Sequence, residues 1–467
     1  MDAHHVSALR LPFELITAIF ILCLPLHRRV RAHPNRTPLN LASICTQWRV
    51  IALETPELWA SIFLEFSDSY GDDSSQTDSV AIAALTMMAL WFTRASDHPL
   101  SISLLCSPET DLPRDLLTQM VAYKHQWGRL ELIISAADFL AFNEIPGPFP
   151  LLSSLHIQVA GGARAVSNTR TTAAQSSVSP NLRALQVPNY TYSISSPDTP
   201  GLSLFPTNLT ALRLGCVALQ SEITTGGIFG PVFHFMPHLL HLEVAVYFAA
   251  PRLEDTAKIS STSLVTLRLN NDIPLDALIA PALQHLHVRI LSRRTPAVLT
   301  DFIQQSQCRL TTLSLELSDD VPEDILFVVL PLTPALTTLI LAAPAPCAVD
   351  LVMRCRTAFL PGTAAAWVPH LRNLLICEWP LTSNGGDLTS LYTRWVALLE
   401  SRPSVAYAEL RIHSEFESDA VIQYPGQEIA ARLQTLNEKM EAIRIVTKRF
   451  TWPEGAEDME LVGGLGE

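Results

Sequence analysis

The sequence predicts an α/β protein in which a small all-helical block precedes an irregular solenoid, whose parallel β-sheet carries helices on its convex side. Two observations lead to this prediction. Apolar residues recur at helical spacing in the N-terminal part of the chain. Farther along, a short apolar motif recurs eleven times with helical patterns between the copies. One copy of such a motif cannot bury its own apolar face, so neighbouring copies must stack on one another.

The composition favours a folded protein that buries much apolar surface. Of the 467 residues, 48% are hydrophobic and 16% are charged, against about 25% charged residues in an average soluble domain. The net charge of −13 argues against a dedicated nucleic-acid-binding protein, which usually carries a basic excess. The 8 cysteines form no CxxC pair, so we expect reduced, intracellular thiols and predict neither a zinc site nor a disulfide framework.

The first apolar run of the chain does not fit a membrane or secretion signal. It extends from Leu15 to Leu26, whereas a helix that crosses a bilayer needs about 20 apolar residues. Glu14 precedes the run and His27, Arg28 and Arg29 follow it, which is the reverse of the charge order of a signal peptide. We therefore expect no membrane association and a cytoplasmic and/or nuclear protein.

Residues 1–66 are predicted to form the helical block. Leu15, Ile19 and Leu22 recur at helical spacing and predict one apolar stripe on a buried helix that begins near Pro12. A second helix is predicted from Leu39 to about Leu53. Its inward-facing residues are expected to be Leu41, Ile44, Cys45, Trp48 and Ile51, and a third short segment contains Pro56, Leu58 and Trp59. A block of this size is only marginally stable by itself. We therefore expect a partner to cover its remaining apolar face.

Two stretches of this block resemble the F-box of the fungal, mushroom-type F-box proteins. The first reads Leu11-Pro12-Phe13-Glu14-Leu15 and continues with Ile19-Phe20 and Leu24-Pro25. The second reads Ser43-Ile44-Cys45-Thr46-Gln47-Trp48-Arg49 and continues with Ile51-Ala52 and Thr55-Pro56-Glu57-Leu58-Trp59. The stretch 27–37 between them is longer and more basic than in most F-boxes. It is interpreted as a solvated loop, with a nuclear-import patch or a contact with an acidic partner as the alternatives.

The resemblance implies a binding function. An F-box docks on a Skp-family adaptor and thereby joins a cullin–RING ubiquitin ligase. The chain would then be the substrate-recognition subunit of an SCF-type (Skp/cullin/F-box) E3 ubiquitin ligase, and no enzyme itself. The positions implied for the adaptor interface, or for the core behind it, are Leu11, Pro12, Leu15, Ile19, Leu41, Ile44, Trp48, Leu58 and Trp59. For Trp48, a role in the core and a role in the adaptor interface are equally open alternatives.

The repeated motif has apolar residues at relative positions 1, 4 and 6. The copies begin at Trp127, Leu152, Leu182, Leu209, Leu239, Leu264, Leu283, Leu310, Leu336, Leu371 and, weakly, Tyr407. Most of the spacings resemble the 20–29 residue period of leucine-rich repeats. Positions 4 and 6 alternate as in a strand, and helices are predicted between copies at 114–125, 296–305, 323–330 and 387–400.

This pattern defines the predicted domains. A polar linker at 67–80 separates the helical block from a leucine-rich-repeat-like solenoid at 81–450, and 451–467 is predicted to be an acidic disordered tail. Large surface loops rich in Ser, Thr and Pro are expected at 160–180 and 189–207. Together with the F-box, this repeat region resembles the mushroom F-box proteins over nearly the whole chain.

The residue between positions 4 and 6 is expected to face away from the helices. This row contains Glu131, His156, Gln186, Arg213, Glu243, Arg268, His287, Ser314, Ile340, Leu375 and Arg411, with His285 and Arg289 beside it. Its middle is polar and basic. We therefore predict that an acidic or phosphorylated segment of a target protein binds near Arg213, Arg268, His285, His287 and Arg289. The alternative is that these are ordinary solvated strand residues.

No catalytic or cofactor motif is found in the sequence. It has no Walker A loop, HExxH or GxSxG pattern, and the glycine-rich stretch 226–230 lacks a following lysine. His234, His238 and His241 are interpreted as surface residues because Pro237 interrupts any helix that would align them. We expect no cofactor, metal or catalytic residue. Two alternatives remain, a repeat scaffold not engaged in ubiquitination and an enzyme with its site in the long loops, which the low charged fraction disfavours.

Overall fold

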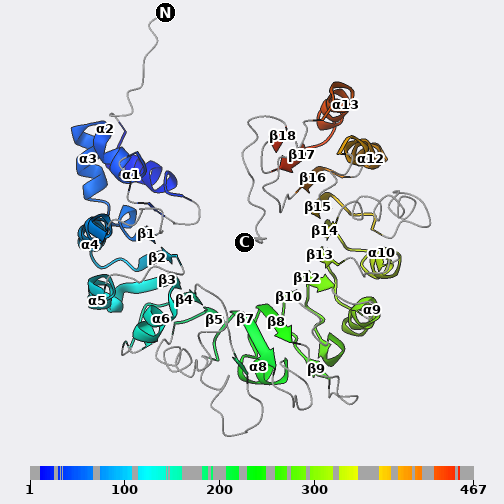
Figure 1. Ribbon diagram of the computed structural model, residues 1–467, viewed down its shortest axis with the longest axis horizontal. Coiled ribbons are helices and arrows are strands. Elements are labelled where there is room, and N and C mark those ends of the chain that lie inside the picture. Colours follow the sequence, from blue (N-terminus) through cyan, green and yellow to red (C-terminus); the bar gives the residue numbers. More distant parts are fainter. Residues whose placement is uncertain are drawn as a thin grey trace, which may run out of the picture. The chain divides into compact units, whose positions relative to one another are not determined.

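The computed structural model of the 467-residue chain forms two compact units, each built around a sheet of parallel strands (Figure 1). The first unit contains Met1–Gln220 with His234–Leu239, and the second contains Ser221–Phe233 with Leu240–Glu467. The structure describes residues 11–25, 30–31, 33, 35–66, 74–107, 114–143, 145, 148–159, 181–187, 191–192, 207–219, 229–248, 258–270, 275–290, 295–318, 325–344, 368–379, 388–401, 405–412, 425–447 and 451–452.

The first unit begins with helices and continues as a sheet. The helical block contains α1 (Phe13–Leu22), α2 (Leu39–Ile44), α3 (Thr46–Leu53) and the 3-10 helix η2 (Pro56–Leu58). The strands are β1 (Ser61–Phe66), β2 (Leu100–Cys106), β3 (Trp127–Ile134), β4 (Ser154–Val159), β5 (Ala184–Val187), β6 (Thr191–Tyr192) and β7 (Ala211–Leu219). Between them lie α4 (Ser74–Ala95), α5 (Arg114–Ala122), η4 (Lys124–Gln126) and α6 (Ala136–Asn143). The parallel order is β1-β2-β3-β4-β5-β7 with β6 on β7, and α4, α5 and α6 cover one face (Figure 1).

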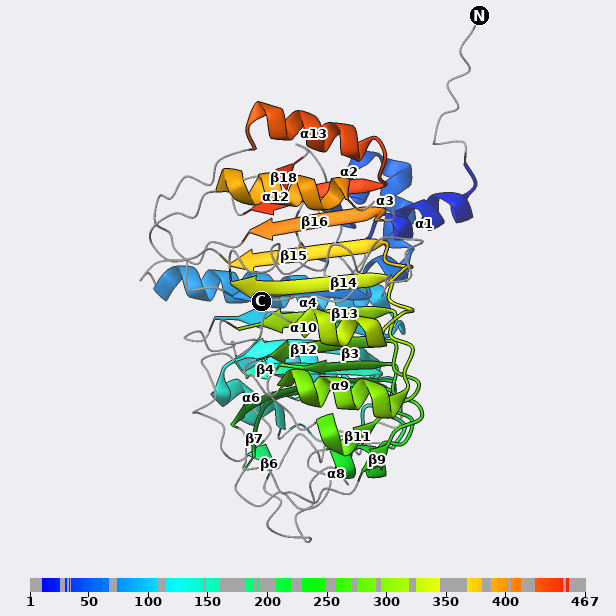
Figure 2. The same cartoon turned by 90° about the vertical axis from the view of Figure 1, so that its right-hand side faces the viewer.

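The second unit repeats this alternation. Its sheet contains β8 (His241–Phe248), β10 (Thr266–Leu269), β12 (His285–Ile290), β13 (Thr312–Leu317), β14 (Thr338–Pro344), β15 (Asn373–Trp379), β16 (Tyr407–Ile412) and β17 (Ala442–Thr447), all parallel in that order. The antiparallel β18 (Thr451–Trp452) ends it, and β9 (Ile259–Ser260) pairs with β11 (Leu278–Ile279). The helices are α8 (Phe229–Phe235), η6 (Leu275–Ala277), α9 (Thr295–Ser306), α10 (Ile325–Val329), η7 (Leu330–Leu332), α12 (Leu388–Glu400) and α13 (Gln427–Asn437). Helices α9, α10, α12 and α13 cover one face (Figure 2).

The predicted repeat is confirmed as an α/β arrangement of sequential parallel strands that alternate with helices, consistent with a leucine-rich-repeat-like solenoid. Each of the eleven predicted copies coincides with a strand. In the copy that begins at Leu283, for example, Leu283, Leu286 and Val288 are buried toward the helices. The predicted helices at 114–125, 296–305, 323–330 and 387–400 also form, as α5 with η4, α9, α10 with η7, and α12.

Within each unit, a backbone ladder at position 2 joins successive copies. The carbonyl oxygen of Gln284 accepts the N–H groups of Thr311 at 2.8 Å and Thr312 at 3.0 Å. The carbonyl of Thr311 in turn accepts the N–H groups of Thr337 at 2.9 Å and Thr338 at 3.0 Å. The hydroxyl of Thr337 donates to the same Thr311 oxygen at 3.0 Å. Because these bonds use backbone atoms, the register between copies tolerates varied side chains and varied lengths between strands.

The register of the last predicted copy is wrong by two residues. Ala408, not Leu410, lies in register with Leu374, so Glu409 takes the place in the row that was predicted for Arg411. Arg411 instead pairs with Cys377, farther along the strand. The small side chain of Ala408 at position 4 explains the error, because the sequence pattern aligned the next large apolar residue in its place.

The sheet begins earlier than predicted. Trp59, Ile62 and Leu64 occupy positions 1, 4 and 6 of a further copy, and all three are buried. Ile62 lies in register with Ile102, which lies in register with Leu130. The helical block and the sheet therefore meet at Trp59, inside the range 1–66 that was predicted for the block.

The predicted linker and tail also take part in regular structure. Helix α4 begins at Ser74, so half of the stretch 67–80 is helical, and residues 67–73 lie outside the described residues. Thr451 and Trp452, predicted as the start of the tail, form β18, while 453–467 lie outside the described part of the chain. The loops predicted at 160–180 and 189–207 are likewise not described, except for the short β6 and residue 207.

The N-terminal block closes the free edge of β1. The N–H of Phe63 donates to the carbonyl of Val30 at 2.8 Å, and Arg31 forms a parallel bridge with Phe63. The guanidinium of Arg31 lies 4.9 Å from the centre of the Phe63 ring and 2.8 Å from the carboxylate of Glu65. An uncovered edge strand would be a template for pairing with another chain, and this segment occupies it.

Trp59 joins the helical block to α4. Its Nε1–H donates to the carbonyl of Ala52 at 2.7 Å. Its ring meets Trp91 edge to face at 4.9 Å, and the guanidinium of Arg94 lies 4.3 Å above it. The indole is fully buried, so of the two roles predicted for Trp59, adaptor interface or core behind it, the structure shows the core.

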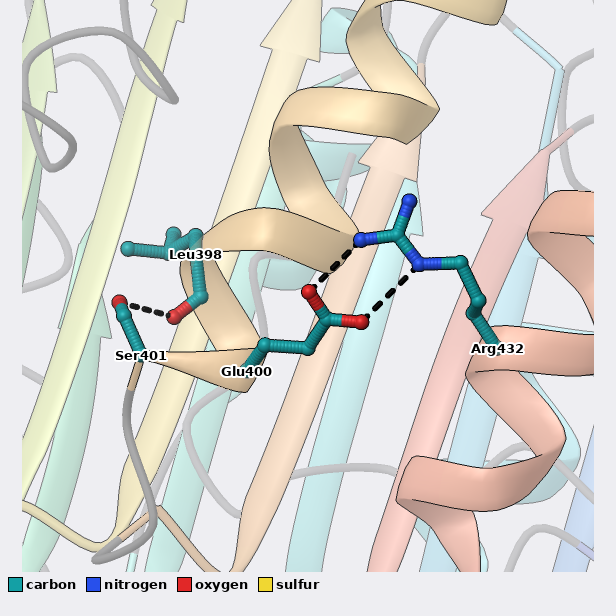
Figure 3. A network of polar contacts seen from close by, with 4 residues as sticks. All are labelled: Leu398, Glu400, Ser401 and Arg432. Carbon is teal, nitrogen blue, oxygen red and sulfur yellow. Dashed lines mark hydrogen bonds and ion pairs between the residues drawn. The ribbon is translucent and has the colours of Figure 1, made fainter.

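Helices of successive copies are also joined by side chains. Arg432 of α13 donates to both carboxylate oxygens of Glu400 at the end of α12, at 3.0 and 2.6 Å (Figure 3). The Ser401 hydroxyl donates to the carbonyl of Leu398 and closes the end of α12. The arginine lowers the pKa of Glu400, but both side chains are largely solvent-exposed, so the pair contributes about 1 kcal/mol or less.

Among the described residues, no helix combines the length and the apolar character needed to span a bilayer.

Substitution Trp59→Ala should lower the free energy of unfolding of the first unit by about 3–5 kcal/mol, since it leaves a cavity between α3 and α4. The measurement is chemical denaturation of the full chain, followed by the fluorescence of the remaining tryptophans. The exposed Leu15→Ala variant is the control and should change stability little. A small effect of Trp59→Ala would mean that the block folds independently of the sheet.

Candidate functional site

Helix α1 exposes apolar side chains on the side that faces away from the core. Ile16 and Phe20 are buried, and the Phe20 ring packs edge to face on Trp48 at 5.0 Å. Leu15 and Ile19 are nevertheless 52% and 44% exposed, and Leu22 is 83% exposed. A helix that is apolar on all sides is normally buried on all sides. The outer side of α1 is therefore the first candidate docking surface.

Other parts of the helical block add to this exposed apolar set. We define the N-terminal apolar set as the large hydrophobic side chains of α1–α3 that are exposed, namely Phe13, Leu15, Ile19, Ile21, Leu22, Ile44, Val50 and Leu53. Leu15 and Ile19 lie one turn apart on one side of α1, so one partner surface can cover both. Burying one such side chain contributes about 1.5–3 kcal/mol.

The predicted inward stripe of α1 is present but faces outward. Leu15, Ile19 and Leu22 form the predicted stripe, while Ile16 and Phe20 face the core. The periodicity could not decide between these two sides because both carry apolar residues at helical spacing.

The second predicted helix is broken in two. Cys45 is extended, with φ −156° and ψ 169°, and separates α2 from α3. Its Sγ accepts the N–H of Trp48 at 3.4 Å and so caps α3. As a result Leu41 and Ile51 are buried as predicted, whereas Ile44 at the end of α2 is exposed.

The residues predicted for the adaptor interface divide between surface and core. Pro12, Leu15, Ile19 and Ile44 are exposed. Leu11 and Trp48 are half-buried, and Leu41, Leu58 and Trp59 are buried. The Nε1 atom of Trp48 is buried without a hydrogen-bond partner in the described structure. Phe13 and Leu22 are exposed apolar residues that the prediction missed, although both lie on the same helix.

The second candidate surface is the side of each sheet that faces away from the helices. In the second unit, one row crosses the strands in register and contains Glu243, Arg268, His287, Ser314, Ile340, Leu375, Glu409 and Arg444. The prediction had placed the first six of these correctly, together with His285 and Arg289 beside them. It missed Glu409 and Arg444, because β16 was misaligned and β17 was not recognised.

Both predicted arginines of this unit already face carboxylates. The Nε of Arg268 lies 3.8 Å from a carboxylate oxygen of Glu243, and the Nε of Arg289 lies 3.1 Å from one of Glu316. Each pair joins neighbouring strands. The carboxylates hold the guanidiniums in position and also balance their charge, so this part of the row is less basic than its sequence indicates.

The histidines contribute no positive charge near neutral pH. The Nδ1 of His287 lies 2.7 Å from the hydroxyl of Ser314, in hydrogen-bond contact. Burial, together with the nearby Arg268, lowers the pKa of His287 to about 4. Burial and the nearby His241 also lower the pKa of His285. This surface therefore presents two oriented ion pairs and neutral imidazoles.

The corresponding row of the first unit forms a polar ladder. The hydroxyl of Ser103 donates to Glu131 at 3.0 Å, and the other carboxylate oxygen of Glu131 lies 3.6 Å from Nδ1 of His156. Arg213 donates to the side-chain oxygen of Gln186 at 3.4 Å. Phe63 and Ser103 extend this row onto β1 and β2, which the sequence analysis missed.

Nothing in the described residues assembles a metal site. No group of three or more His, Cys, Asp or Glu side chains there is arranged to hold a metal ion. His234, His238 and His241 are all exposed.

Comparisons with known proteins identify no family. No model of a protein family matches the chain, and no curated protein matches it either. Among solved structures, the chain is similar to a protein of Bacteroides fragilis determined as a structural-genomics target. That similarity has 12% sequence identity and a TM-score of 0.31, and it covers 57% of this chain and 66% of the other.

The ring of His287 should titrate near pH 4 in the folded protein. Because this pKa lies below the usual value of about 6.5, the unfolded chain binds the proton more tightly. The stability that neutral His287 contributes is thus complete above about pH 6.5 and is lost as the pH falls toward 4. NMR of the ring and denaturation over this pH range measure both effects. The His287→Asn variant should flatten the stability profile, and a ring that titrates near its usual value would contradict the assignment.

Proposed function

We propose that this chain is the substrate-recognition subunit of an SCF-type E3 ubiquitin ligase. Helices α1–α3 bind a Skp-family adaptor, and the side of the repeat sheets that faces away from the helices binds a target protein. The observation that carries the proposal is the exposure of Leu15 and Ile19 on a helix that is apolar on all sides. The resemblance of residues 11–59 to an F-box supports a Skp-family adaptor as the partner for that surface.

The architecture supports two separate binding surfaces, one for the adaptor and one for the target. A sheet of stacked parallel strands presents many side chains on one rigid surface, which is how repeat proteins bind other proteins. The helical block is joined to that sheet through Trp59 and through the bridge between Arg31 and Phe63. An adaptor bound at α1 is thereby held at a defined position relative to the sheet of the first unit.

In this proposal, ubiquitination is accelerated because the target is held close to the enzyme that modifies it. The chain raises the local concentration of a target beside a ubiquitin-loaded enzyme that the complex supplies. The chain itself makes and breaks no bond. Arg213, Arg268, His285, His287 and Arg289 are the proposed target-binding residues. The oriented pairs Arg268–Glu243 and Arg289–Glu316 allow them to recognise a polar segment by geometry as well as by charge.

Adaptor binding is tested by co-expression with a fungal Skp-family adaptor and pull-down. The wild type should capture the adaptor, and the Leu15→Ala/Ile19→Ala variant should lose capture, since each contact contributes about 2 kcal/mol. Both side chains are exposed, so folding should be unaffected. The matched control is Phe327→Ala/Val328→Ala, which removes equally exposed apolar side chains from α10. A well-folded wild type that captures no adaptor would leave a repeat scaffold not engaged in ubiquitination.

Target binding is tested by crosslinked capture from fungal extract, followed by mass spectrometry. The Arg289→Glu variant should lose targets that the wild type captures. This substitution also places two carboxylates, at positions 289 and 316, side by side on neighbouring strands. The control is therefore Arg289→Glu/Glu316→Arg, in which the exchange restores the ion pair. Targets lost from both variants contact Arg289 itself. If the exchanged pair captures the same targets as the wild type, Arg289 serves only the fold.

A further inference from the structure

Part of the sheet surface in the second unit is buried although no described helix or strand covers it. On the side that faces away from the helices, Leu375 and Cys377 are each 2% exposed and Glu409 is 1% exposed. Ile340 and Arg289, on the same side of the sheet, are only half-buried. Neighbours within a sheet surround a side chain laterally but leave the space above it open. Burial to this degree therefore requires covering atoms.

This buried area has an apolar centre and a positive side. We define the β14–β17 patch as Ile340, Leu375, Cys377, Glu409, Arg411 and Arg444, which lie on four successive strands. Glu409 accepts hydrogen bonds from the hydroxyl of Tyr407 and the guanidinium of Arg411. Arg444 lies in register with Glu409 on the next strand. The patch thus contains two arginines and one carboxylate, and it has a net positive charge.

The sequence that follows β18 has the complementary composition. Residues 453–467 contain five acidic side chains, no basic side chain, and the apolar residues Met459, Leu461, Val462 and Leu465. Strand β18 runs antiparallel to β17 and pairs Trp452 with Ile445. The chain therefore leaves β18 toward the level of Arg444. From β18 to β15 there are three strand spacings of roughly 4.8 Å, a distance of about 14 Å, which about five extended residues span.

We propose that residues 453–467 bind the β14–β17 patch, with acidic side chains at Arg411 and Arg444 and apolar side chains on Leu375. This intramolecular contact explains why an apolar leucine and a thiol are buried on the side of the sheet without helices. The contact would also divide the side of the sheet that faces away from the helices into a covered part and an accessible part. Arg268, His285 and His287 on β10 and β12 stay accessible to a partner, whereas a partner that needs Leu375 must first displace the segment. The inference does not depend on the ligase function.

The thiol of Cys377 reports directly on this contact. Burial raises its pKa to about 11, so the covered thiol is unreactive. Cys106 and Cys308 are buried elsewhere in the fold, and Cys23 is exposed. The experiment treats the native chain with a thiol reagent and measures the labelling rate of each cysteine by mass spectrometry. In the intact chain we expect labelling of Cys23 and protection of Cys106, Cys308 and Cys377.

Three variants test the assignment of the segment. Truncation after Trp452 should raise the labelling rate of Cys377 about tenfold or more, equivalent to ~1.4 kcal/mol, while Cys106 and Cys308 stay protected. Adding a synthetic peptide of residues 453–467 should restore protection. The full-length Glu457→Gln/Asp458→Asn/Glu460→Gln variant should show a smaller increase. Its matched control, Glu14→Gln/Glu54→Gln/Asp97→Asn, removes the same charge from exposed positions of the first unit and should show none.

Two results would overturn the proposal. The first is a truncated chain in which Cys377 stays as protected as Cys106 and Cys308, because other atoms would then cover the patch. The second applies if the truncation unfolds the second unit, in which case Cys308 reacts together with Cys377. The full-length charge variant then decides, and unchanged protection of Cys377 in that variant rejects residues 453–467 as the occupant.

Discussion

The structure depends on the stacking of one repeat copy on the next. Each copy buries its apolar positions 1, 4 and 6 only because the neighbouring copies cover them, and the position-2 carbonyl sets the register by accepting two N–H groups of the following copy. This interaction uses the backbone and a few apolar side chains. It therefore leaves the opposite side of each strand free to vary, and that is where the polar rows lie.

A stack of parallel strands must end somewhere, and both ends described are closed by the chain itself. At β1 the segment around Val30 and Arg31 pairs with the edge, and Trp59 anchors the helical block behind it. At β17 the short antiparallel β18 takes the edge position. The helical block thus has two sides with different tasks. Its inner side closes the sheet, and its outer side carries exposed leucine and isoleucine side chains.

In the polar rows, the partner on the neighbouring strand decides whether a charged side chain adds net charge to the surface. Arg268 and Arg289 look like a basic patch in the sequence, but Glu243 and Glu316 balance them from the neighbouring strands. His287 is neutral because it is buried near an arginine. Under the proposed function, such a surface would select a target by the positions of its polar groups more than by net attraction. Among the described residues of this row and its neighbours, two arginines, Arg411 and Arg444, lie beside one carboxylate, Glu409.

The sequence by itself determined the alternation of strands and helices, because the spacing of positions 1, 4 and 6 reflects which side chains every copy must bury. It also placed most of the row that faces away from the helices, from Glu131 to Leu375. Only the tertiary structure decided which side of α1 is buried, since Ile16 with Phe20 and Leu15 with Ile19 are equally apolar pairs. It likewise decided the register of β16 and the charge balance of the rows. Those depend on which residues meet across strands that are distant in sequence, and a local pattern carries no information about that pairing.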